Sequence, residues 1–248
     1  MLNITDPREY YFDSYLFEYN AVIENICKKD DGVLLQFNKT IFHPQGGGQP
    51  SDEGELIIKG KSYPIQQLIC EKESDVIWHK IKIDEVEIEK NTEIQMKINE
   101  EKRRLYARLH SAGHLIDVAI TNTGNPLTPI KGYHFPDGPY VEYNGQVSNN
   151  EQLKEQLEKT CNELIENCED NFKVQTGLYN YEDALRSFKE VPNYLPKNKP
   201  TRFLKLVPSD IGKPCGGTHV KHIKEIGKLI ISKIVKKGKN LRISYLVK

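Results

Sequence analysis

The strongest structural signal in the sequence is one long amphipathic helix near the middle of the chain. Asn99 is suited to cap its N-terminus, acidic residues follow in the first turn, where negative charge favours the helix dipole, and Gly124 suits its end. Between them apolar residues recur at a spacing of three to four, at Leu105, Leu109, Ala112, Ile116 and Ala119. The pattern predicts a helix over about 99–124 with one face in the core.

Two pairs of potential metal ligands lie about a hundred residues apart. His110 and His114 are four apart in the predicted helix and therefore share one of its faces, beside the apolar stripe. Cys215 and His219 have the same spacing around two glycines, which permit a tight backbone path. Three imidazoles and a thiolate suit Zn²⁺, and the long separation favours a site in a cleft over a local zinc finger. Either pair alone is more often structural than metal-binding, but the two pairs together predict zinc.

The number of zinc ligands stays open at this point. Four protein ligands normally close a structural site, whereas a hydrolytic zinc keeps one position for water or substrate. Either one of the four residues stays off the metal or binds it weakly, or the zinc mainly holds the substrate. The HSAGH segment also lacks the glutamate that acts as the base in helical zinc proteases.

A glycine-rich segment near the N-terminus is the third unusual feature. Gly46, Gly47 and Gly48 lack side chains where a backbone can approach a ligand, and their amide groups can donate hydrogen bonds. Pro44 and Pro50 stiffen the chain on both sides, which argues against a loose hairpin loop. The segment lacks the Lys-Ser/Thr ending of a phosphate-binding loop.

The remaining pattern indicates an α+β fold. Short strand-like runs at 33–37, 55–58 and 76–79 predict a small barrel or sandwich over residues 1–96. Further helices are expected at 150–168, where Cys161 and Cys168 fit core positions, and at 181–189. Runs at 229–235 and 241–247 flank a turn and predict a hairpin.

The charge and the cysteine content exclude few classes of function. Thirty-five basic and thirty-five acidic residues cancel, but the C-terminal part is rich in lysine, so a local RNA-binding face is expected there beside the alternative of a merely solvated hairpin. The candidates for this face are Lys221, Lys236, Lys237, Lys239 and Arg242. Five cysteines without a framework spacing indicate reduced thiols. Neither a membrane span nor a signal peptide is visible, so a cytoplasmic location is expected.

The motifs taken in order resemble a known family. TIFHPQGGGQPSD (40–52), RLHSAGH (108–114) and PCGGTHV (214–220) resemble the editing region of alanyl-tRNA synthetases, and more closely their freestanding AlaX-type relatives. The resemblance extends through KGYHFPDGPYVEY (131–143) and the closing strands, and so covers nearly the whole chain. The two metal pairs alone are shared with threonyl-tRNA synthetase editing domains, whereas the triple glycine and 131–143 make the assignment specific. The length resembles that of the medium AlaX class and leaves no room for an aminoacylation domain.

The resemblance implies a translation-factor-like β-barrel over 1–96, followed over 97–248 by a two-layer α/β editing domain of the type added to threonyl- and alanyl-tRNA synthetases. It assigns the metal to His110, His114, Cys215 and His219. It also matches Thr40 and the run Gly46, Gly47, Gly48 and Gln49 to a loop that faces the aminoacyl end and helps select serine. His43 stands where many relatives have tyrosine and is interpreted as a packing residue without a catalytic role.

The implied function is zinc-dependent deacylation of alanine tRNA mischarged with serine or glycine, without ATP. Zinc binds the amino group or polarises the ester, a zinc-bound water attacks, and amides near Gly216 and Gly217 or the triple glycine are candidates for stabilising the oxyanion. Thr40 is the candidate contact to the serine hydroxyl. The alternatives are editing of another mischarged tRNA, such as Ser-tRNA(Thr), and a non-catalytic zinc-stabilised RNA-binding module. The sequence does not indicate the oligomeric state.

Overall fold

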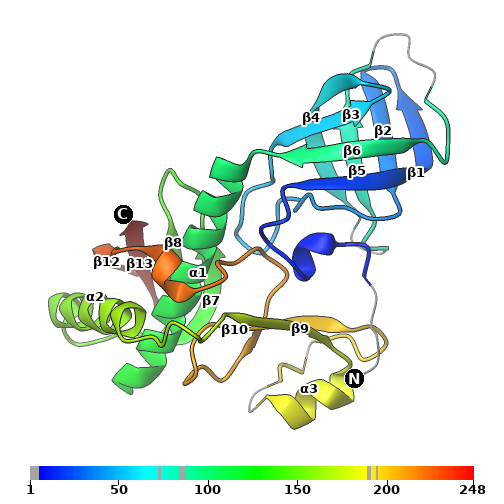
Figure 1. Ribbon diagram of the computed structural model, residues 1–248. Helices are drawn as coiled ribbons and strands as arrows, with labels where there is room; N and C mark the ends of the chain where they lie inside the picture. The colour runs from blue at the N-terminus through cyan, green and yellow to red at the C-terminus, as the bar shows by residue number, and fades with distance from the viewer. Residues whose placement is uncertain (1–5, 72–73, 84–87, 189–190, 194) are drawn as a thin grey trace. The chain divides into compact units, whose positions relative to one another are not determined.

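The computed structural model describes residues 6–71, 74–83, 88–188, 191–193 and 195–248 (Figure 1). Contacts between Cα atoms divide the chain into two compact units. The first consists of Met1–Gly46 and Pro50–Arg104, and the second of Gly47–Gln49 and Leu105–Lys248. The glycine-rich segment is therefore shared between the two units. The domain boundary expected between residues 96 and 97 stays a prediction.

The first unit is a closed barrel of six antiparallel strands in the order β1-β2-β5-β4-β3-β6. The strands are β1 (Glu18–Lys29), β2 (Gly32–Phe37), β3 (Gly54–Ile58), β4 (Lys61–Cys70), β5 (Ile77–Ile81) and β6 (Glu93–Ile98), and a short 3-10 helix, η1 (Glu9–Tyr11), precedes them. Pairing of β1 with both β2 and β6 closes the barrel. Alternate residues of each strand point inward and form one core, as the burial pattern of β5 illustrates. The small barrel predicted from the short strands is confirmed.

The helix α1 (Glu100–Thr123) begins in the first unit and continues into the second. Arg103 in its first turns is fully buried and pairs with the equally buried carboxylate of Asp52. The same guanidinium donates to the carbonyl oxygens of Ser14, at 2.8 Å, and Ile41, at 2.6 Å. A buried charge pair of this kind is stable only when its remaining hydrogen-bonding capacity is used, as it is here.

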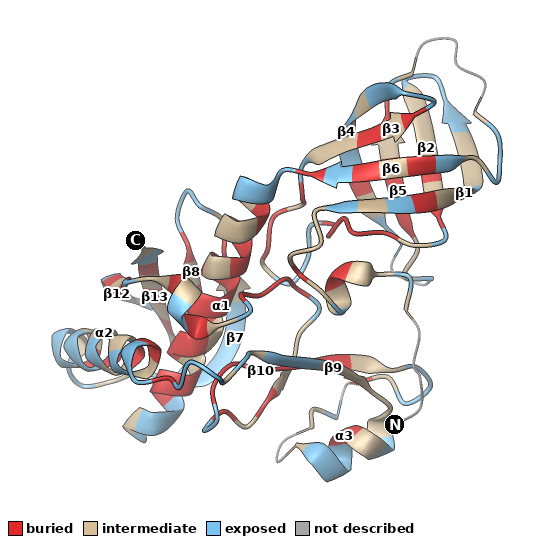
Figure 2. Ribbon diagram, in the orientation of Figure 1, coloured by how far each residue is buried: buried red, intermediate tan, exposed pale blue. Residues whose placement is uncertain are grey.

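The second unit is built on a four-stranded antiparallel sheet in the order β12-β13-β8-β7. Its strands are β7 (Thr128–Tyr133), β8 (Tyr140–Asn144), β12 (Leu229–Lys237) and β13 (Asn240–Val247). Apolar residues of α1 and of α2 (Asn150–Glu166) share one core with the inward-facing residues of this sheet (Figure 2). The β12–β13 hairpin, the long helix and the α+β architecture are confirmed.

A smaller sheet completes the second unit, in the order β11-β10-β9. It contains β9 (Gln175–Tyr179), β10 (Thr201–Lys205) and β11 (Lys213–Pro214), and is accompanied by α3 (Tyr181–Ser187) and the 3-10 helix η2 (Ile223–Ile226). The helix expected over 181–189 ends at Ser187 because Phe188 is extended, and residue 189 lies outside the described residues. Among the described helices, none combines the length and the apolar character that crossing a membrane requires.

Candidate metal centre

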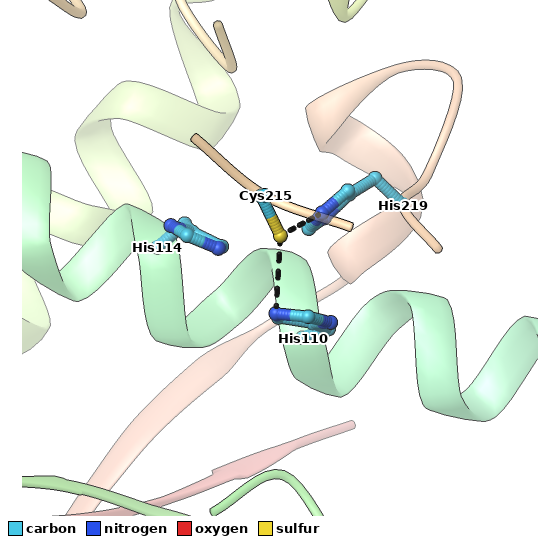
Figure 3. A group of neighbouring side chains, drawn as sticks. All are labelled: His110, His114, Cys215 and His219. Atoms are coloured by element: carbon cyan, nitrogen blue, oxygen red, sulfur yellow. Dashed lines mark hydrogen bonds between the residues drawn. The ribbon is translucent and has the colours of Figure 1, made fainter. Parts of the chain in front are cut away.

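Four side chains from two distant segments of the second unit converge on one point (Figure 3). His110 and His114 lie one turn apart on α1, whereas Cys215 directly follows β11 and His219 ends the same turn. Their ligand atoms all lie within 4.8 Å of one another. The two pairs that the sequence placed about a hundred residues apart are therefore neighbours in space.

The spacing of these atoms fits a tetrahedral zinc site. Sγ of Cys215 lies 3.2 Å from Nε2 of His219 and 3.5 Å from Nε2 of His110. Zinc–sulfur and zinc–nitrogen bonds of ordinary length at a tetrahedral angle separate the two ligand atoms by about 3.6 Å. Both the donor types and their separations therefore fit zinc.

The far nitrogens of two of these imidazoles are held by hydrogen bonds. Nδ1 of His110 donates to Oε1 of the fully buried Gln49 at 2.8 Å, since that oxygen also accepts from the amide of Thr218 at 2.9 Å. Nδ1 of His219 lies 3.1 Å from the hydroxyl of Ser111, which accepts from the amide of Val220. Fixing Nδ1 leaves Nε2 of each ring directed at Cys215, the arrangement that histidine ligands of metals usually adopt.

His114 lies near a carboxylate, at a distance too long for a direct hydrogen bond. Its Nδ1 lies 3.8 Å from Oδ2 of Asp117, one turn further along α1. The carboxylate of Asp117 also accepts from the hydroxyl of Tyr143, at 2.5 Å, and from Nζ of Lys213, at 3.0 Å. This group is a candidate for orienting His114 as Gln49 orients His110.

The Cys215 turn is fixed by a buried arginine. Nη1 of Arg202 donates to the carbonyl oxygens of Cys215 and Gly217, at 3.0 and 2.8 Å, and the amide of Gly217 donates to Sγ of Cys215 at 3.4 Å. Burial opposes ionisation of the thiol, but the charge of His114, its hydrogen bond and the charge of Arg202 outweigh burial and lower the pKa of Cys215. For the same pair, burial opposes protonation of His114, but the Cys215 thiolate and Asp117 raise the pKa of that imidazole. The thiol is thus prepared to ionise, which metal binding requires.

A cavity of about 370 Å³ opens beside the four residues. Its lining includes His114, Cys215 and Gly216 from the metal centre and Gly47 from the glycine-rich segment, and Ile130, Lys131 and Gly132 of β7 form another wall. Its volume lies within the range of small-ligand sites. A molecule bound here is in direct contact with two of the four ligand residues.

His134 is a buried histidine of the same cavity that the sequence did not single out. The hydroxyl of Tyr245 donates to the carbonyl of Leu109 at 2.9 Å, so it accepts at 2.6 Å from Nδ1 of His134. This tautomer leaves Nε2 as a hydrogen-bond acceptor. Burial, and secondarily the charge of His114, lower the pKa of His134 to about 3, so its ring, which stacks on His110, is neutral near pH 7.

Residues 13–102 match the family model described as tRNA synthetases class II (A), and residues 210–243 match the threonyl and alanyl tRNA synthetase second additional domain. The alanyl-tRNA editing protein AlaX-L of Pyrococcus horikoshii is 31% identical over 238 residues, which are 94% of this chain. The alanyl-tRNA editing protein AlaX-M of Methanosarcina barkeri is 27% identical over 95% of this chain and 96% of its own length. Along nearly its whole length the chain is thus similar to the AlaX family of alanyl-tRNA editing proteins.

Coverage differs among these AlaX-family and synthetase relatives. The chain spans 56% of the length of the AlaX-L protein. It spans 25% of the alanine–tRNA ligase of Methanobrevibacter smithii, to which it is 28% identical over 229 residues. The AlaX resemblance inferred from the motifs is thus confirmed for the family, along nearly the whole of this chain.

The glycine-rich segment contributes to the candidate metal centre mainly through Gln49. Gln49 contacts His110 and Thr218, and Gly47 lines the cavity. Gly48 has a φ of +79°, and its carbonyl accepts from the amide of His134 at 2.8 Å. A Cβ at Gly48 would lie 2.3 Å from the carbonyl oxygen of Gly132, so the close approach to β7 requires glycine. Gly46 belongs to the first unit.

Thr40 and His43 both lie in the first unit. The hydroxyl of Thr40 is buried, 2.8 Å from Nε2 of His79, and accepts from the amide of Phe42 at 3.1 Å. His43 is buried with its ring edge-on to Tyr10, as its interpretation as a packing residue suggested. The selection of serine by Thr40 stays a prediction.

The two amides named for the oxyanion differ in their availability. The amide of Gly217 already donates to Sγ of Cys215, and a Cβ there would lie 2.1 Å from Cε1 of His110. Gly216 lines the cavity. Gly216 is therefore the better candidate of the two.

The basic candidates fall into two groups. Lys236, Lys237 and Lys239 are exposed at the tip of the β12–β13 hairpin, and Arg242 lies further along β13. Lys221 is exposed in a different segment, where its carbonyl accepts from the amide of Val174.

Several site residues were not found from the sequence. Ser111 and Asp117 lie on α1 beside the two histidines, and each is three residues from His114, a spacing that could have marked them. Arg202 and Tyr245 carried no such signal, because only the folded chain brings them to the site. His134 lay within a recognised motif, but nothing in its spacing connected it with α1.

Proposed function

We propose that this chain is a zinc-dependent aminoacyl-tRNA deacylase that hydrolyses the ester bond of alanine tRNA mischarged with serine or glycine. The observation that carries the proposal is the convergence of three imidazoles and a thiolate at the wall of a 370 Å³ cavity. The family relation supports it, since the relatives are named alanyl-tRNA editing proteins.

His110, His114, Cys215 and His219 would hold the zinc ion, with Gln49, Ser111 and Asp117 orienting the imidazoles. A bound zinc ion supplies a Lewis acid that can hold the amino group of the substrate, polarise the ester carbonyl or lower the pKa of water. The chain itself would supply position, since an ester bound in the cavity would lie beside Cys215 and His114.

Charge that develops on the ester oxygen needs a hydrogen-bond donor. The amide of Gly216, at the cavity wall, is the candidate, because the neighbouring amide of Gly217 is already bonded to the thiol. A donor of this kind typically contributes a factor of about a hundred or more to the rate.

Discrimination has to rest on one hydroxyl, because serine differs from alanine by a single oxygen. A site built to bind that hydroxyl can reject the residue lacking it strongly. Thr40 is the residue that the family resemblance proposes for this contact. His134 is a second candidate, because it lines the cavity and its Nε2 is left as an acceptor.

The proposed nucleic-acid partner is the tRNA itself, and Lys221, Lys236, Lys237, Lys239 and Arg242 are its candidate phosphate contacts. Each phosphate contact should make binding weaker as salt rises. An affinity for tRNA that did not change between low and high salt would count against this face.

The test is a deacylation assay without ATP on purified Ser-tRNA(Ala), Gly-tRNA(Ala), Ala-tRNA(Ala) and Ser-tRNA(Thr). We expect rapid loss of serine or glycine from alanine tRNA, retention of alanine, and inhibition by a chelator that added zinc reverses. Faster hydrolysis of Ser-tRNA(Thr) than of Ser-tRNA(Ala) would identify threonine tRNA as the substrate instead. A folded, zinc-loaded sample that hydrolyses none of them would instead be a binding module.

Two cysteine variants distinguish loss of metal binding from a general effect on folding. Cys215→Ser removes the thiolate and is expected to lower the bound zinc per chain and the deacylation rate together. Cys70→Ser is the matched control, since Cys70 is exposed in β4 of the first unit. Full zinc content in the Cys215→Ser variant would show that this residue stays off the metal.

A further inference from the structure

We propose that the outer face of the β12-β13-β8-β7 sheet is a stacking platform for the unpaired 3′-terminal nucleotides of the tRNA. The inference rests on the proposed function, because it takes tRNA as the partner. It adds the surface on which the single-stranded end lies before its last residue enters the cavity.

Four planar groups form a continuous row on this face. The rings of Phe135 and Tyr133 are stacked at 4.4 Å and 10°, and those of Tyr133 and Tyr140 at 5.2 Å and 18°. The guanidinium of Arg242 lies 4.0 Å from the centre of the Tyr140 ring. Strand register produces the row. Tyr133 of β7 pairs with Tyr140 of β8, and Arg242 of β13 pairs with Glu142, two positions after Tyr140.

The core of the unit does not use these rings. Val141 and Tyr143 of β8 point inward and belong to the core. Because side chains alternate along a strand, Tyr140, the residue before Val141, points outward. Tyr133, Phe135 and Tyr140 are all half-buried, and β7 is exposed along most of its length (Figure 2). Within the row each ring covers a face of its neighbour, so the face left for a nucleobase is that of Phe135 away from Tyr133. Aromatic rings on an antiparallel sheet are the type of surface on which single-stranded nucleic acids stack.

The charges around the row favour an anionic partner. Nζ of Lys131 lies 5.8 Å from the centre of the Tyr140 ring, and exposed lysines continue across the hairpin at Lys233, Lys236, Lys237 and Lys239. The carboxylates that face the row are already bonded, Glu142 to Arg242 at 2.7 Å and Asp137 to the hydroxyl of Tyr133 at 3.3 Å. Base stacking on rings combined with phosphate contacts to lysine is the expected mode.

The platform is continuous with the candidate active site through one strand. β7 lies at the edge of the sheet, and its residues Ile130, Lys131 and Gly132 line the cavity while Tyr133 belongs to the row. A strand of RNA stacked on the outer face therefore needs to cross only the edge of β7 to reach the metal centre. A duplex cannot do this, because its bases are stacked on one another.

The test compares binding of two probes, an uncharged tRNA with its complete 3′ end and the same tRNA without its unpaired 3′ nucleotides. We expect Phe135→Leu to weaken binding of the complete tRNA about tenfold, the scale of one lost stacking contact, and to leave the shortened tRNA unaffected. Phe135→Tyr and Phe135→Trp keep a ring and should bind as the wild type does. Phe12→Leu is the matched control, since Phe12 is a 52% exposed aromatic residue of the first unit.

Three results would overturn the platform: wild-type affinity of Phe135→Leu for the complete tRNA, equal weakening for both probes, or a changed oligomeric state with unchanged affinity. The last would assign the face to a second copy of the chain. The melting temperature and the Phe135→Tyr variant separate lost stacking from lost folding. A wild-type protein that hydrolyses no mischarged tRNA, yet binds tRNA through its 3′ end and Phe135, would refute the proposed function and support the platform.

Discussion

Nδ1 of His110 donates its hydrogen bond to Oε1 of Gln49, a residue 61 positions earlier in the chain. Gln49→Ala removes this acceptor, so we expect zinc affinity to fall 10- to 100-fold, the usual effect of losing a partner of a histidine ligand. Gln49→Glu keeps an acceptor and should retain most of the affinity. Competition against a coloured chelator measures both. Gln45→Ala, an exposed change in the same segment, is the control, and equal affinities for all three variants would show that Gln49 does not orient His110.

Gly48 and Gly47 offer a matched pair of alanine substitutions. Both have positive φ values, +79° and +56°, but an added Cβ meets the carbonyl oxygen of Gly132 at 2.3 Å only at Gly48, with nothing within 4 Å at Gly47. We therefore expect Gly48→Ala to displace the segment carrying Gln49 and to reduce deacylation at least tenfold. Gly47→Ala should cost only the strain of its backbone conformation, about 1 kcal/mol. Equal rates for the two variants would contradict this account.

Thr40 links the barrel core to a predicted role in selecting serine. Thr40→Val loses the bonds to His79 and to the amide of Phe42, so we expect the free energy of unfolding of the first unit to fall by about 1–3 kcal/mol. Thr40→Ser, which keeps the hydroxyl, is the control. The ratio of kcat/KM for Ser-tRNA(Ala) over Ala-tRNA(Ala), measured on the same variants, tests the second role. A ratio that falls in the Thr40→Val variant but not in the Thr40→Ser variant would support selection of serine by Thr40. An unchanged ratio in both variants would limit the role of Thr40 to the barrel core.

The pH dependence of stability should report on His79. Burial lowers the pKa of this imidazole to about 4, and its Nδ1 donates to the carbonyl of Leu35 while Nε2 faces Thr40. The imidazole of His79 binds a proton near pH 6.5 in the unfolded chain but not in the folded chain. Its contribution to the free energy of unfolding is therefore complete above pH 6.5 and is lost as the pH falls toward 4. The loss is on the order of 3 kcal/mol.

Trp78, the single tryptophan of the chain and a residue of β5 beside His79, makes this measurable by fluorescence during denaturant unfolding. His79→Gln has no group that titrates there and should make the profile shallower between pH 4 and 6.5, with the remaining slope shared by His134, whose pKa burial also lowers. The same slope in the variant and the wild type would assign the pH dependence to other groups.

The metal centre could be predicted further than its surroundings. Helical periodicity placed His110 and His114 on one face, and the chemistry of nitrogen and sulfur ligands joined them to Cys215 and His219 without any knowledge of the fold. The orientation of these ligands could not be predicted in the same way. It depends on Gln49 and Arg202, which reach the site only through the tertiary fold, and no local pattern encodes such contacts.

The fold shows the same division. The barrel, the long helix and the hairpin followed from local patterns, whereas the closing pair β1–β6 joins strands some seventy residues apart and has no local signature. β9 was not predicted, because its five residues Gln175–Tyr179 include a glycine and show little apolar alternation. β11 is only two residues long, and it is fixed by its pairing with β10 rather than by its own sequence.

The assignment of Gly47–Gln49 to the second unit has a consequence for how such a site is inherited. A gene fragment encoding only residues 97–248 would carry all four metal ligands but would lack the carboxamide that sets the tautomer of His110. Recombination that exchanged barrels freely would therefore separate the ligands from their orienting group. An exchange that keeps residues 47–49 with the helical part, or that brings in a barrel with glutamine at position 49, preserves this orienting group, so the centre constrains where the gene can be cut and rejoined.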